Sequence, residues 1–488
     1  MSVPIHTTKR VSLPCGDIIV TAGRENYRAM VPPSASSLRI LGSLADYYDV
    51  AEYRTNGRSA LLNERPFFTF GETIQKGPHG ELVAAIPNTS APVIDKRGNP
   101  LDLAHFPEGL PVPLVELTET ERIFEADTDC KIIITPEGGI CEAAPPGHGW
   151  VWYKKHMEDL MEDGTRIRVF CGTGIAPVKV NETTGQVVSR RVVHGQLIFN
   201  EQEPAFGTFC AVRYATWYYL WGQRGEHIYL ARVGIWYAIQ RELYEFWNGR
   251  TFTHDMDAME PVLTGYSSGS FFRTNLFGHR YNWGFLGTDM SENPSIITGY
   301  ANRAAGPYQM TRVVDFRALS PAYHGSNCVY AHPWAFKEGD GQLMITWYED
   351  KLSTIIAAKL QLNMLHQGGF WKDISLKELP AVMLSEVQTR IALVEAMGKL
   401  AQVHQEVEID NDGAITIKFV GTTRDAVDRA AKNLRDLIIN VYGELLKEEG
   451  FKELGLRKPS WRAAVRKRIK AWWRKIRRRQ DDSDDEDF

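Results

Sequence analysis

Residues 457–488 carry charge in two dense blocks, one basic and one acidic, unlike the rest of the chain. This segment therefore limits which residues can form the folded core. Residues 457–480 hold 12 Lys and Arg without any Asp or Glu, and residues 481–488 hold 6 Asp and Glu. The rest of the chain, residues 1–456, carries 44 basic and 54 acidic side chains, a formal charge of −10. Because so dense a run of cations cannot be buried in a core, the sequence predicts an acidic folded body with a basic terminal appendage.

The basic segment has the pattern of an amphipathic helix. Trp461, Val465, Ile469, Trp472 and Ile476 recur at intervals of three or four residues and form one apolar stripe. The surface around that stripe is cationic, and this combination favours phosphate groups, with tryptophans available to stack on unpaired bases. We therefore predict a site for nucleic acid or another anionic surface at Arg462, Arg466, Lys467, Arg468, Lys470, Trp472, Trp473, Arg474, Lys475, Arg477, Arg478 and Arg479.

Other roles for this segment stay open at the level of sequence. RNA is favoured only weakly over DNA, and an anionic membrane surface also attracts a helix of this composition. A helix-capturing partner protein, an import receptor, or docking on the acidic body are further alternatives. Ser483 precedes three acidic residues and resembles a kinase site, where a phosphate would strengthen the competition of the acidic tail with other anions.

Composition predicts a folded protein of several domains, since 43% of the 488 residues are apolar and 11% are aromatic. The six cysteines form no Cys-x-x-Cys pair, and the first residues lack the apolar core of a signal peptide. No apolar run reaches the roughly 20 residues that a transmembrane helix needs. We expect a cytoplasmic or virion protein that is not secreted, has no transmembrane segment and needs neither a metal nor a cofactor.

The pattern of apolar residues predicts an α+β fold. Residues 1–200 form a strand-rich region, interrupted by helices at residues 37–53 and 151–161. Residues 201–380 form an aromatic helical core with long loops, in which residues 205–250 make two helices joined at Gly222–Gly225. Residues 381–456 form a helix, a β-hairpin and a second helix. The basic amphipathic helix (457–480) and an acidic, disordered tail (481–488) complete the predicted domains.

One pentapeptide matches a catalytic motif. Gly265-Tyr266-Ser267-Ser268-Gly269 has the Gly-x-Ser-x-Gly pattern and resembles the nucleophile elbow of α/β-hydrolases. Downstream His324, His332 and His366 are available as a general base. A serine hydrolase with Ser267 as nucleophile is therefore an alternative, although the flanking residues do not predict the strand and helix that such an elbow joins.

The preferred prediction is a structural protein. An aromatic-rich body without a cofactor or catalytic signature, carrying a charged terminal arm, has the general layout of viral capsid and nucleocapsid proteins. This layout implies self-association through the body and nucleic-acid binding through the arm. A peripheral membrane protein that uses the same terminal helix is the second alternative.

Overall fold

The computed structural model describes most of the chain up to residue 447. The described residues are 7–13, 16–24, 28–46, 52–77, 79, 81–94, 99–103, 112–161, 165–189, 191, 197–291, 294–316, 328–349, 352–365, 370–377, 403–409, 415–421 and 423–447. The basic segment and the acidic tail lie outside these residues. So does the helix that the sequence predicts near residues 385–402.

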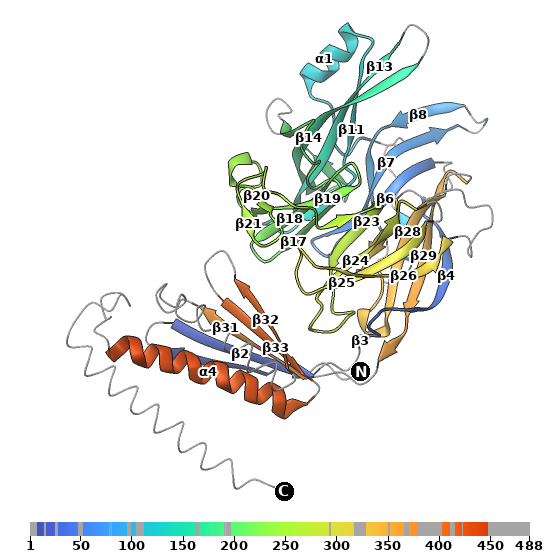
Figure 1. The fold of residues 1–488 in the computed structure, drawn as a ribbon. Helices are drawn as coiled ribbons and strands as arrows, with labels where there is room; N and C mark the ends of the chain where they lie inside the picture. Colours follow the sequence, from blue (N-terminus) through green and yellow to red (C-terminus); the bar gives the residue numbers. More distant parts are fainter. Residues whose placement is uncertain are drawn as a thin grey trace. The chain divides into compact units, whose positions relative to one another are not determined.

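The chain forms two compact units (Figure 1), and the larger one is inserted into the smaller one. Residues 27–366 make the larger unit, which we call the propeller unit. Residues 1–26 and 367–488 make the smaller, which we call the terminal unit. The structure thus groups the residues differently from the consecutive domains that the sequence predicts.

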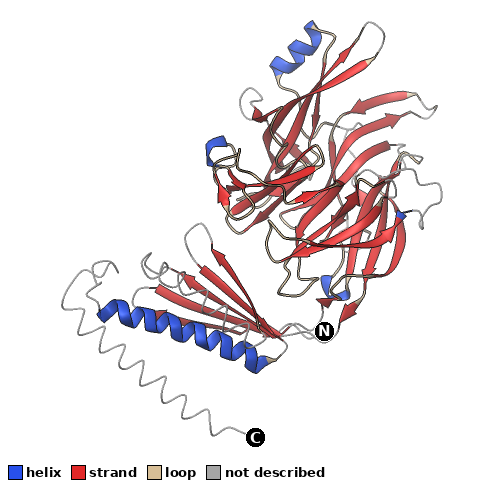
Figure 2. Cartoon of the chain, viewed as in Figure 1, coloured by secondary structure: helices blue, strands red, loops and turns tan. Residues whose placement is uncertain are grey.

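The propeller unit is built almost wholly of strands (Figure 2), and the predicted α+β class with a helical centre is wrong. The aromatic residues 205–250 form strands rather than two helices. The described residues within the predicted helices 37–53 and 151–161 are also largely extended. Tyr and Trp favour strands. Strands that are buried on both faces show no alternation of apolar and polar residues, so a short apolar run does not distinguish a strand from a helix.

Most strands of this unit belong to five antiparallel sheets, which we call blades 1 to 5 in chain order. Blade 1 contains β6 (Glu52–Leu62), β7 (Arg65–Lys76), β8 (Leu82–Ile86) and β9 (Thr89–Pro92). Blade 2 contains β11 (Lys131–Thr135), β12 (Ile140–Glu142), β13 (His148–Leu160), β14 (Arg166–Val180), β15 (Val187–Ser189) and β16 (Leu197–Asn200). Blade 3 contains β17 (Cys210–Tyr214), β18 (Trp217–Arg224), β19 (His227–Gly234), β20 (Glu245–Trp247), β21 (Phe252–Thr253) and β22 (Leu263–Thr264).

Blades 4 and 5 complete the set. Blade 4 contains β23 (Tyr266–Arg273), β24 (Trp283–Asp289), β25 (Ser295–Ala301) and β26 (Gln309–Asp315). Blade 5 contains β27 (Tyr330–His332), β28 (Gln342–Glu349), β29 (Thr354–Leu362) and the early strand β4 (Ala35–Ser43). The short elements are β3 (Arg28–Ala29) with β30 (Met364–Leu365), β5 (Ala45–Asp46) with β10 (Asp102–Leu103), α1 (Glu119–Asp127), η2 (Arg241–Leu243) and η3 (Glu338–Asp340).

One inner strand of each blade contacts an inner strand of the next, and these contacts close into a ring. Strand β6 contacts β12, β12 contacts β17, β17 contacts β23, β23 contacts β27, and β27 contacts β6 again. Radially arranged antiparallel sheets around a central channel are the architecture of a β-propeller. The described part of this unit therefore forms a five-bladed propeller.

Blade 5 is completed by a strand from the other end of the unit. Strand β4 pairs antiparallel with β29, so that Ile40 is the partner of Ala358. In Figure 1, β4 is blue and lies beside the yellow and orange strands β28 and β29. This pairing ties the beginning of the propeller unit to its last blade and covers the edge of β29.

The aromatic side chains pack between blades. Trp221 of blade 3 stacks on Phe271 of blade 4, with ring centroids 4.3 Å apart. Trp152 of blade 2 meets the edge of Tyr218 of blade 3 at 5.6 Å. All four are nearly fully buried. The sequence reasoning that these rings form core is consistent with this packing, although the rings stand on strands.

The terminal unit has a five-stranded antiparallel sheet covered by one helix. The order is β1 (Thr7–Leu13), β2 (Gly16–Arg24), β31 (Phe370–Lys377), β33 (Ile415–Gly421) and β32 (His404–Ile409). Helix α4 (Arg424–Lys447) packs Val427, Leu434 and Ile438 onto Ile374 and Ile417 of the sheet. The hairpin and the second helix that the sequence predicts here are present. Among the described residues, no helix is both long enough and apolar enough to cross a bilayer.

Candidate ligand-binding site

The ring of inner strands encloses a cavity of about 580 Å³. All five inner strands, or the residues next to them, contribute to its wall. On β23 the lining residues, Ser270–Arg273, lie toward the C-terminal end of the strand, whereas β12 and β17 contribute along their whole length. Arg213 is exposed, so the cavity reaches solvent at this residue. Cavities of this size and central position are typical of small-molecule sites.

Close packing of glycines helps to bring two blades together beside this cavity. A Cβ atom on Gly138 would lie 1.6 Å from the carbonyl oxygen of Gly207, so no other residue fits there without movement of the backbone. The neighbouring Gly139 has φ = +82° and passes next to the side chain of Arg58. This turn leads directly into β12 and positions it in the ring.

The cavity is cationic although the folded body is acidic. Arg58, Arg213 and Arg273 line it, and Glu142 is the only carboxylate among its lining residues that the structure describes. Outside residues 457–488 the chain has a formal charge of −10. A concave site with charge opposite to that of the surrounding surface concentrates ligands of the complementary sign. The electrostatics therefore favour an anion.

Arg58 lies at the floor of the cavity and ties three inner strands together. Its side chain comes from β6 and is only 5% exposed. Nη2 donates to the carbonyl oxygens of Phe209 at 2.7 Å and Gly269 at 2.6 Å, and Nη1 donates to Ser270 Oγ at 3.4 Å. The guanidinium carbon lies 4.1 Å from the ring centroid of Tyr330. This buried charge is held by carbonyl dipoles and an aromatic face, without a carboxylate among these contacts.

The other two arginines come from neighbouring inner strands. Arg273 of β23 stacks on Tyr214, with its guanidinium carbon 3.9 Å from the ring centroid, and lies 5.3 Å from that of Trp283. Arg213 of β17 donates from Nη1 to the carbonyl oxygen of Glu142 at 3.3 Å. Stacking on aromatic rings orients Arg273 while leaving N–H groups available for other acceptors.

Arg58 also lines a second, smaller cavity of about 70 Å³. Its wall includes Ser267, Tyr330 and an ion pair in which Lys154 Nζ lies 2.5 Å from Glu137 Oε2. Arg58 thus belongs to the walls of both cavities. The smaller one is of the size that holds ordered water rather than an organic ligand.

A chain of hydrogen bonds joins blade 1 to blade 5 beside the larger cavity. Trp334 Nε1 donates to Ser59 Oγ at 2.6 Å, and Ser59 Oγ lies 2.6 Å from His332 Nδ1. His332 Nε2 lies 2.8 Å from Thr346 Oγ1, whose hydroxyl donates to the carbonyl oxygen of Gly57 at 3.2 Å. Because the Thr346 hydroxyl donates to Gly57, its oxygen accepts the hydrogen bond from His332 Nε2. The imidazole proton is therefore on Nε2, and Nδ1 accepts a hydrogen bond from the Ser59 hydroxyl.

Burial of His332 determines the acid–base behaviour of this hydrogen-bonded network. Its ring is 0% exposed, and burial together with the positive charge of Arg58 lowers the pKa of the imidazole to about 3. A base with so low a pKa removes protons poorly at neutral pH. Ser59 and His332 therefore link the first and last blades and do not form an activated nucleophile.

Two free cysteines also stand in the cavity wall. Cys141 of β12 and Cys210 of β17 are buried and belong to adjacent strands of the ring. Burial raises the pKa of both thiols above the ordinary value. Thiols of this kind are poor nucleophiles, and these two fill the wall as small apolar groups.

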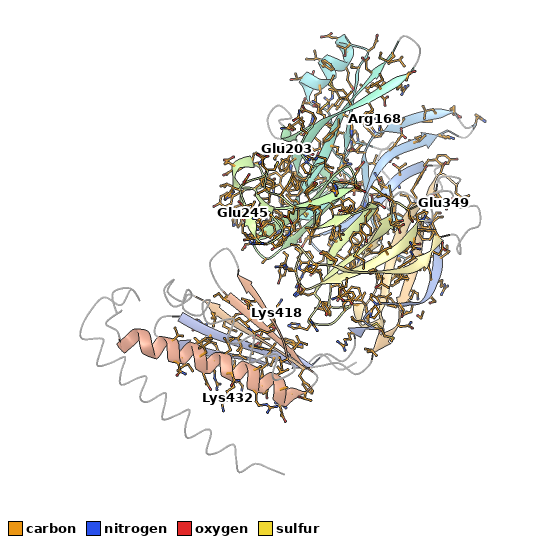
Figure 3. All side chains as sticks on the ribbon, in the orientation of Figure 1. Arg168, Glu203, Glu245, Glu349, Lys418 and Lys432 are labelled. Carbon is orange, nitrogen blue, oxygen red and sulfur yellow. The ribbon has the colours of Figure 1, made fainter. Side chains whose placement is uncertain are left out.

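Each cavity has one carboxylate among its described lining residues. Among the described lining residues, the larger cavity has Glu142, which accepts from the backbone of Asn63 and Gly147, and the smaller has Glu137, which is paired with Lys154. Two carboxylates of the same unit that Figure 3 labels, Glu203 and Glu245, line neither cavity and form ion pairs with arginines.

Ser267 is not part of a nucleophile elbow. It lies in β23, next to a register shift in the pairing with β24, and the preceding element is the short strand β22. An elbow instead places the serine between a strand and a helix. Of the histidines proposed as partners, His332 contacts Ser59 instead, and His324 and His366 lie outside the described residues. The serine-hydrolase alternative is therefore wrong in its structural premise.

The other predicted site residues are not tested by the structure. The cationic and tryptophan side chains of residues 462–479 and Ser483 lie outside the described residues. Among the residues that are described, no group of three or more His, Cys, Asp and Glu side chains is arranged to hold a metal ion.

Sequence reasoning missed the cavity residues. Arg58, Arg213 and Arg273 stand on three separate strands, and no local motif connects them. The inner strands begin at residues 52, 140, 210, 266 and 330, and these unequal intervals leave no repeat period to detect. The only available signal is that each arginine interrupts a run of strand-forming residues.

Comparison with known proteins gives no family for the chain. No family model matches it. No curated protein is similar enough in sequence to match.

Solved structures resemble the chain only distantly. A Bacteroides ovatus protein classed provisionally as a hydrolase has a TM-score of 0.41 and 10% identity, covering 72% of this chain and 93% of that one. A family 117 glycoside hydrolase from Zobellia galactanivorans has a TM-score of 0.37 and 11% identity, with coverages of 68% and 90%. An alpha-L-arabinofuranosidase from Clostridium thermocellum has a TM-score of 0.35 and 9% identity, with coverages of 67% and 98%. Scores this low do not carry an activity over to this chain.

These findings contradict the prediction of a viral capsid or nucleocapsid protein. The propeller unit is a ring of blades around a cavity rather than part of the mixed α+β body with a helical centre that the capsid prediction assumed. Self-association itself is not tested by the structure and stays a prediction.

Proposed function

We propose that the propeller unit binds a small organic anion in its central cavity. The observation that carries this proposal is the charge of the cavity wall, where three arginines stand with one glutamate inside a body of opposite net charge. The cavity has the volume of a small-molecule site, and aromatic side chains next to the arginines provide an apolar surface for the rest of the ligand. The proposal concerns binding, because the described lining residues lack a catalytic pair.

The proposal is tested with ligands that share one skeleton and differ in charge. Three of them share a sugar skeleton: glucose is neutral, glucuronate carries a carboxylate and glucose 6-phosphate carries a phosphate. Citrate and inorganic phosphate are added as further anions. Binding to the full-length protein is measured by calorimetry and by the shift in unfolding temperature. We expect at least one anion to bind and glucose not to bind. No binding by any of the five would overturn the proposal.

Arg213→Gln tests the electrostatic basis of the binding. Arg213 is exposed at the rim, so its replacement should leave the fold intact while it removes one positive charge from the cavity. We expect anion affinity to fall about threefold to tenfold. Arg250→Gln, on an exposed turn of blade 3 that does not line the cavity, is the matched control and should have no effect.

We also propose that the basic segment 457–480 binds nucleic acid, as its sequence predicts. The support is its composition, with 12 cations, three tryptophans and no carboxylate. This second site is independent of the first, because the segment belongs in sequence to the terminal unit. An anionic membrane surface would compete for the same cations, but its binding would depend on the apolar stripe as well.

A further inference from the structure

Part of strand β14 in blade 2 has an edge without a strand partner. Strand β13 pairs with one side of β14 along nearly its whole length. On the other side, β15 and β16 pair with it only between Gly172 and Val180. Among the described residues, no strand therefore pairs with residues 166–171 on that side. Such an edge presents unpaired backbone N–H and C=O groups, to which another strand can bind.

The hairpin that joins β13 to β14 determines which backbone groups face this edge. The N–H of Met161 donates to the carbonyl oxygen of Thr165 at 2.8 Å, so these groups point across the hairpin. Backbone groups in an antiparallel pair point alternately toward the partner strand and away from it. The register is regular as far as Phe170, so Val169 points its N–H and C=O groups toward β13. Arg168 and Phe170 point theirs toward the open edge.

The same hairpin exposes three apolar side chains on one face. Met161, Ile167 and Val169 are 44%, 45% and 56% exposed. Ile167 and Val169 share a face because side chains alternate along a strand, and Met161 shares it because it lies opposite Thr165. An open edge with exposed apolar side chains is a typical place for another chain to bind.

The opposite edge of this sheet is protected. Strand β11 is the outer strand there, and the N–H of Ile132 donates to Glu125 Oε1 of α1 at 2.6 Å. On the β14 side, Arg166 and Arg168 carry charges of the kind that keep other strands away, but they form ion pairs with Glu158 at 3.1 and 2.9 Å. Within the described part of the chain, the β14 edge therefore has neither a covering element nor uncompensated charge.

We infer that this edge pairs antiparallel with the same edge of a second copy of the chain, so that the sheet of blade 2 continues across a two-fold axis. With the axis at Val169, Arg168 lies opposite Phe170 of the second copy, and Ile167 lies opposite its Cys171. An arginine beside an aromatic ring is attractive, and the apolar side chains of both copies form one face. With the axis at Arg168 or Ile167, arginines face each other, which is destabilising.

This inference does not depend on anion binding. Residues 166–171 are not among the described residues that line the two cavities. The pairing gives a specific surface to the self-association that the sequence predicts.

Val169→Lys tests the pairing at its centre. In the dimer the two lysines face each other across the axis, and directly opposed like charges strongly weaken an interface. We expect nuclease-treated, full-length wild-type protein to be a dimer in analytical ultracentrifugation, and the dimer of the variant to be about tenfold weaker or more. Ile123→Lys, at a side chain of α1 that is 53% exposed, is the control and should leave the dimer unchanged. A monomeric wild-type protein, or an equally stable dimer of Val169→Lys, contradicts the inference.

Val169→Cys covers the case in which the lysine variant does not fold. The two copies of this residue lie on the axis as a pair without mutual hydrogen bonds, with Cα atoms about 4.5 Å apart, a distance that a disulfide bridges. Glutathione disulfide oxidises the two thiols to one disulfide and is itself reduced to two glutathione molecules. We expect a covalent dimer on non-reducing electrophoresis for Val169→Cys, but not for Ile123→Cys or the wild type. A dimer in solution that this cysteine does not cross-link would show that the copies associate through another surface.

Discussion

The two units of this protein close their sheets in different ways. The propeller unit closes as a ring, in which β4 completes blade 5 and polar side chains connect one inner strand to the next. The terminal unit has an open sheet, whose N-terminal strand β2 pairs with β31, and the apolar face of α4 covers it. Apolar burial stabilises both units, but the stability of the first should depend in addition on buried polar links.

The units also differ in how they use positive charge. The cavity has three arginines fixed by the fold, whereas the terminal segment has 12 cations in a continuous run. A few fixed charges suit a small anion, and many charges along one segment suit a polyanion. The expected dependence on salt therefore differs between the two sites.

Removal of residues 457–488 should produce the largest effect. We expect the truncated protein to lose nucleic-acid binding and to keep anion binding in the cavity. In the full-length protein, nucleic-acid affinity should fall by about 10³ or more between 50 and 200 mM salt if six or more phosphates are neutralised. Filter binding or fluorescence anisotropy measures this. Equal affinity with and without the segment would contradict the assignment.

Changes to the apolar stripe of this segment distinguish nucleic acid from membrane. Replacement of Trp472 and Ile476 by Ser should greatly weaken binding to vesicles of anionic lipid, since insertion depends on apolar area. Duplex binding should change little, because it depends on the cations. Equal losses in both assays would leave the membrane alternative without support.

Arg58→Met tests the polar links of the propeller. The change leaves the carbonyl groups of Phe209 and Gly269 buried without their donor, at a cost of about 3 kcal/mol or more in the free energy of unfolding. Urea unfolding followed by tryptophan fluorescence measures it, with Arg250→Met as control. A loss below about 1 kcal/mol would show that the ring does not depend on Arg58.

Leu434→Ala tests the apolar core of the terminal unit. Leu434 lies in α4 and is fully buried against the sheet. We expect the terminal unit to lose about 3 kcal/mol of stability, from lost burial and the cavity that remains. Hydrogen exchange resolved by segment should show this loss in β31 and β33 but not in β6 or β27. An equal loss in the inner strands of the propeller would mean that the two units unfold together.

The smallest expected effect is a dependence of propeller stability on pH. The pKa of His332 is about 3 in the folded protein and about 6.5 when the chain is unfolded, so the unfolded state binds the extra proton first as pH falls. Its contribution to stability is complete above about pH 6.5 and is lost as the pH falls toward 3. Between about pH 7 and pH 4.5 we expect a loss of about 2 kcal/mol.

His332→Gln provides the comparison for this group. Glutamine does not titrate, so the variant should show a shallower fall in stability over the same pH range, whatever its stability at neutral pH. Denaturant unfolding at several pH values measures the two slopes. Identical slopes would mean that another group dominates the acid sensitivity of the propeller.

Local signals sufficed for the C-terminal part of the fold. Residues 407–419 show the alternation of a hairpin, and residues 424–445 show a helical stripe, and both elements are present. They were predictable because one face of each is apolar and the other is polar. In residues 217–234 both faces of the strands are largely buried between blades, so the alternation is absent, and the aromatic run fits either period.

The sequence by itself determined the separation of charge, the aromatic content of the core, and the hairpin and helix of the terminal unit, because each of these depends on neighbouring residues. Only the tertiary structure decided the rest. It joined strands from opposite ends of the propeller unit into one blade and brought Arg58, Arg213 and Arg273 to one cavity. Closure of a ring depends on contacts between residues that are distant in the chain, and such contacts leave no local pattern.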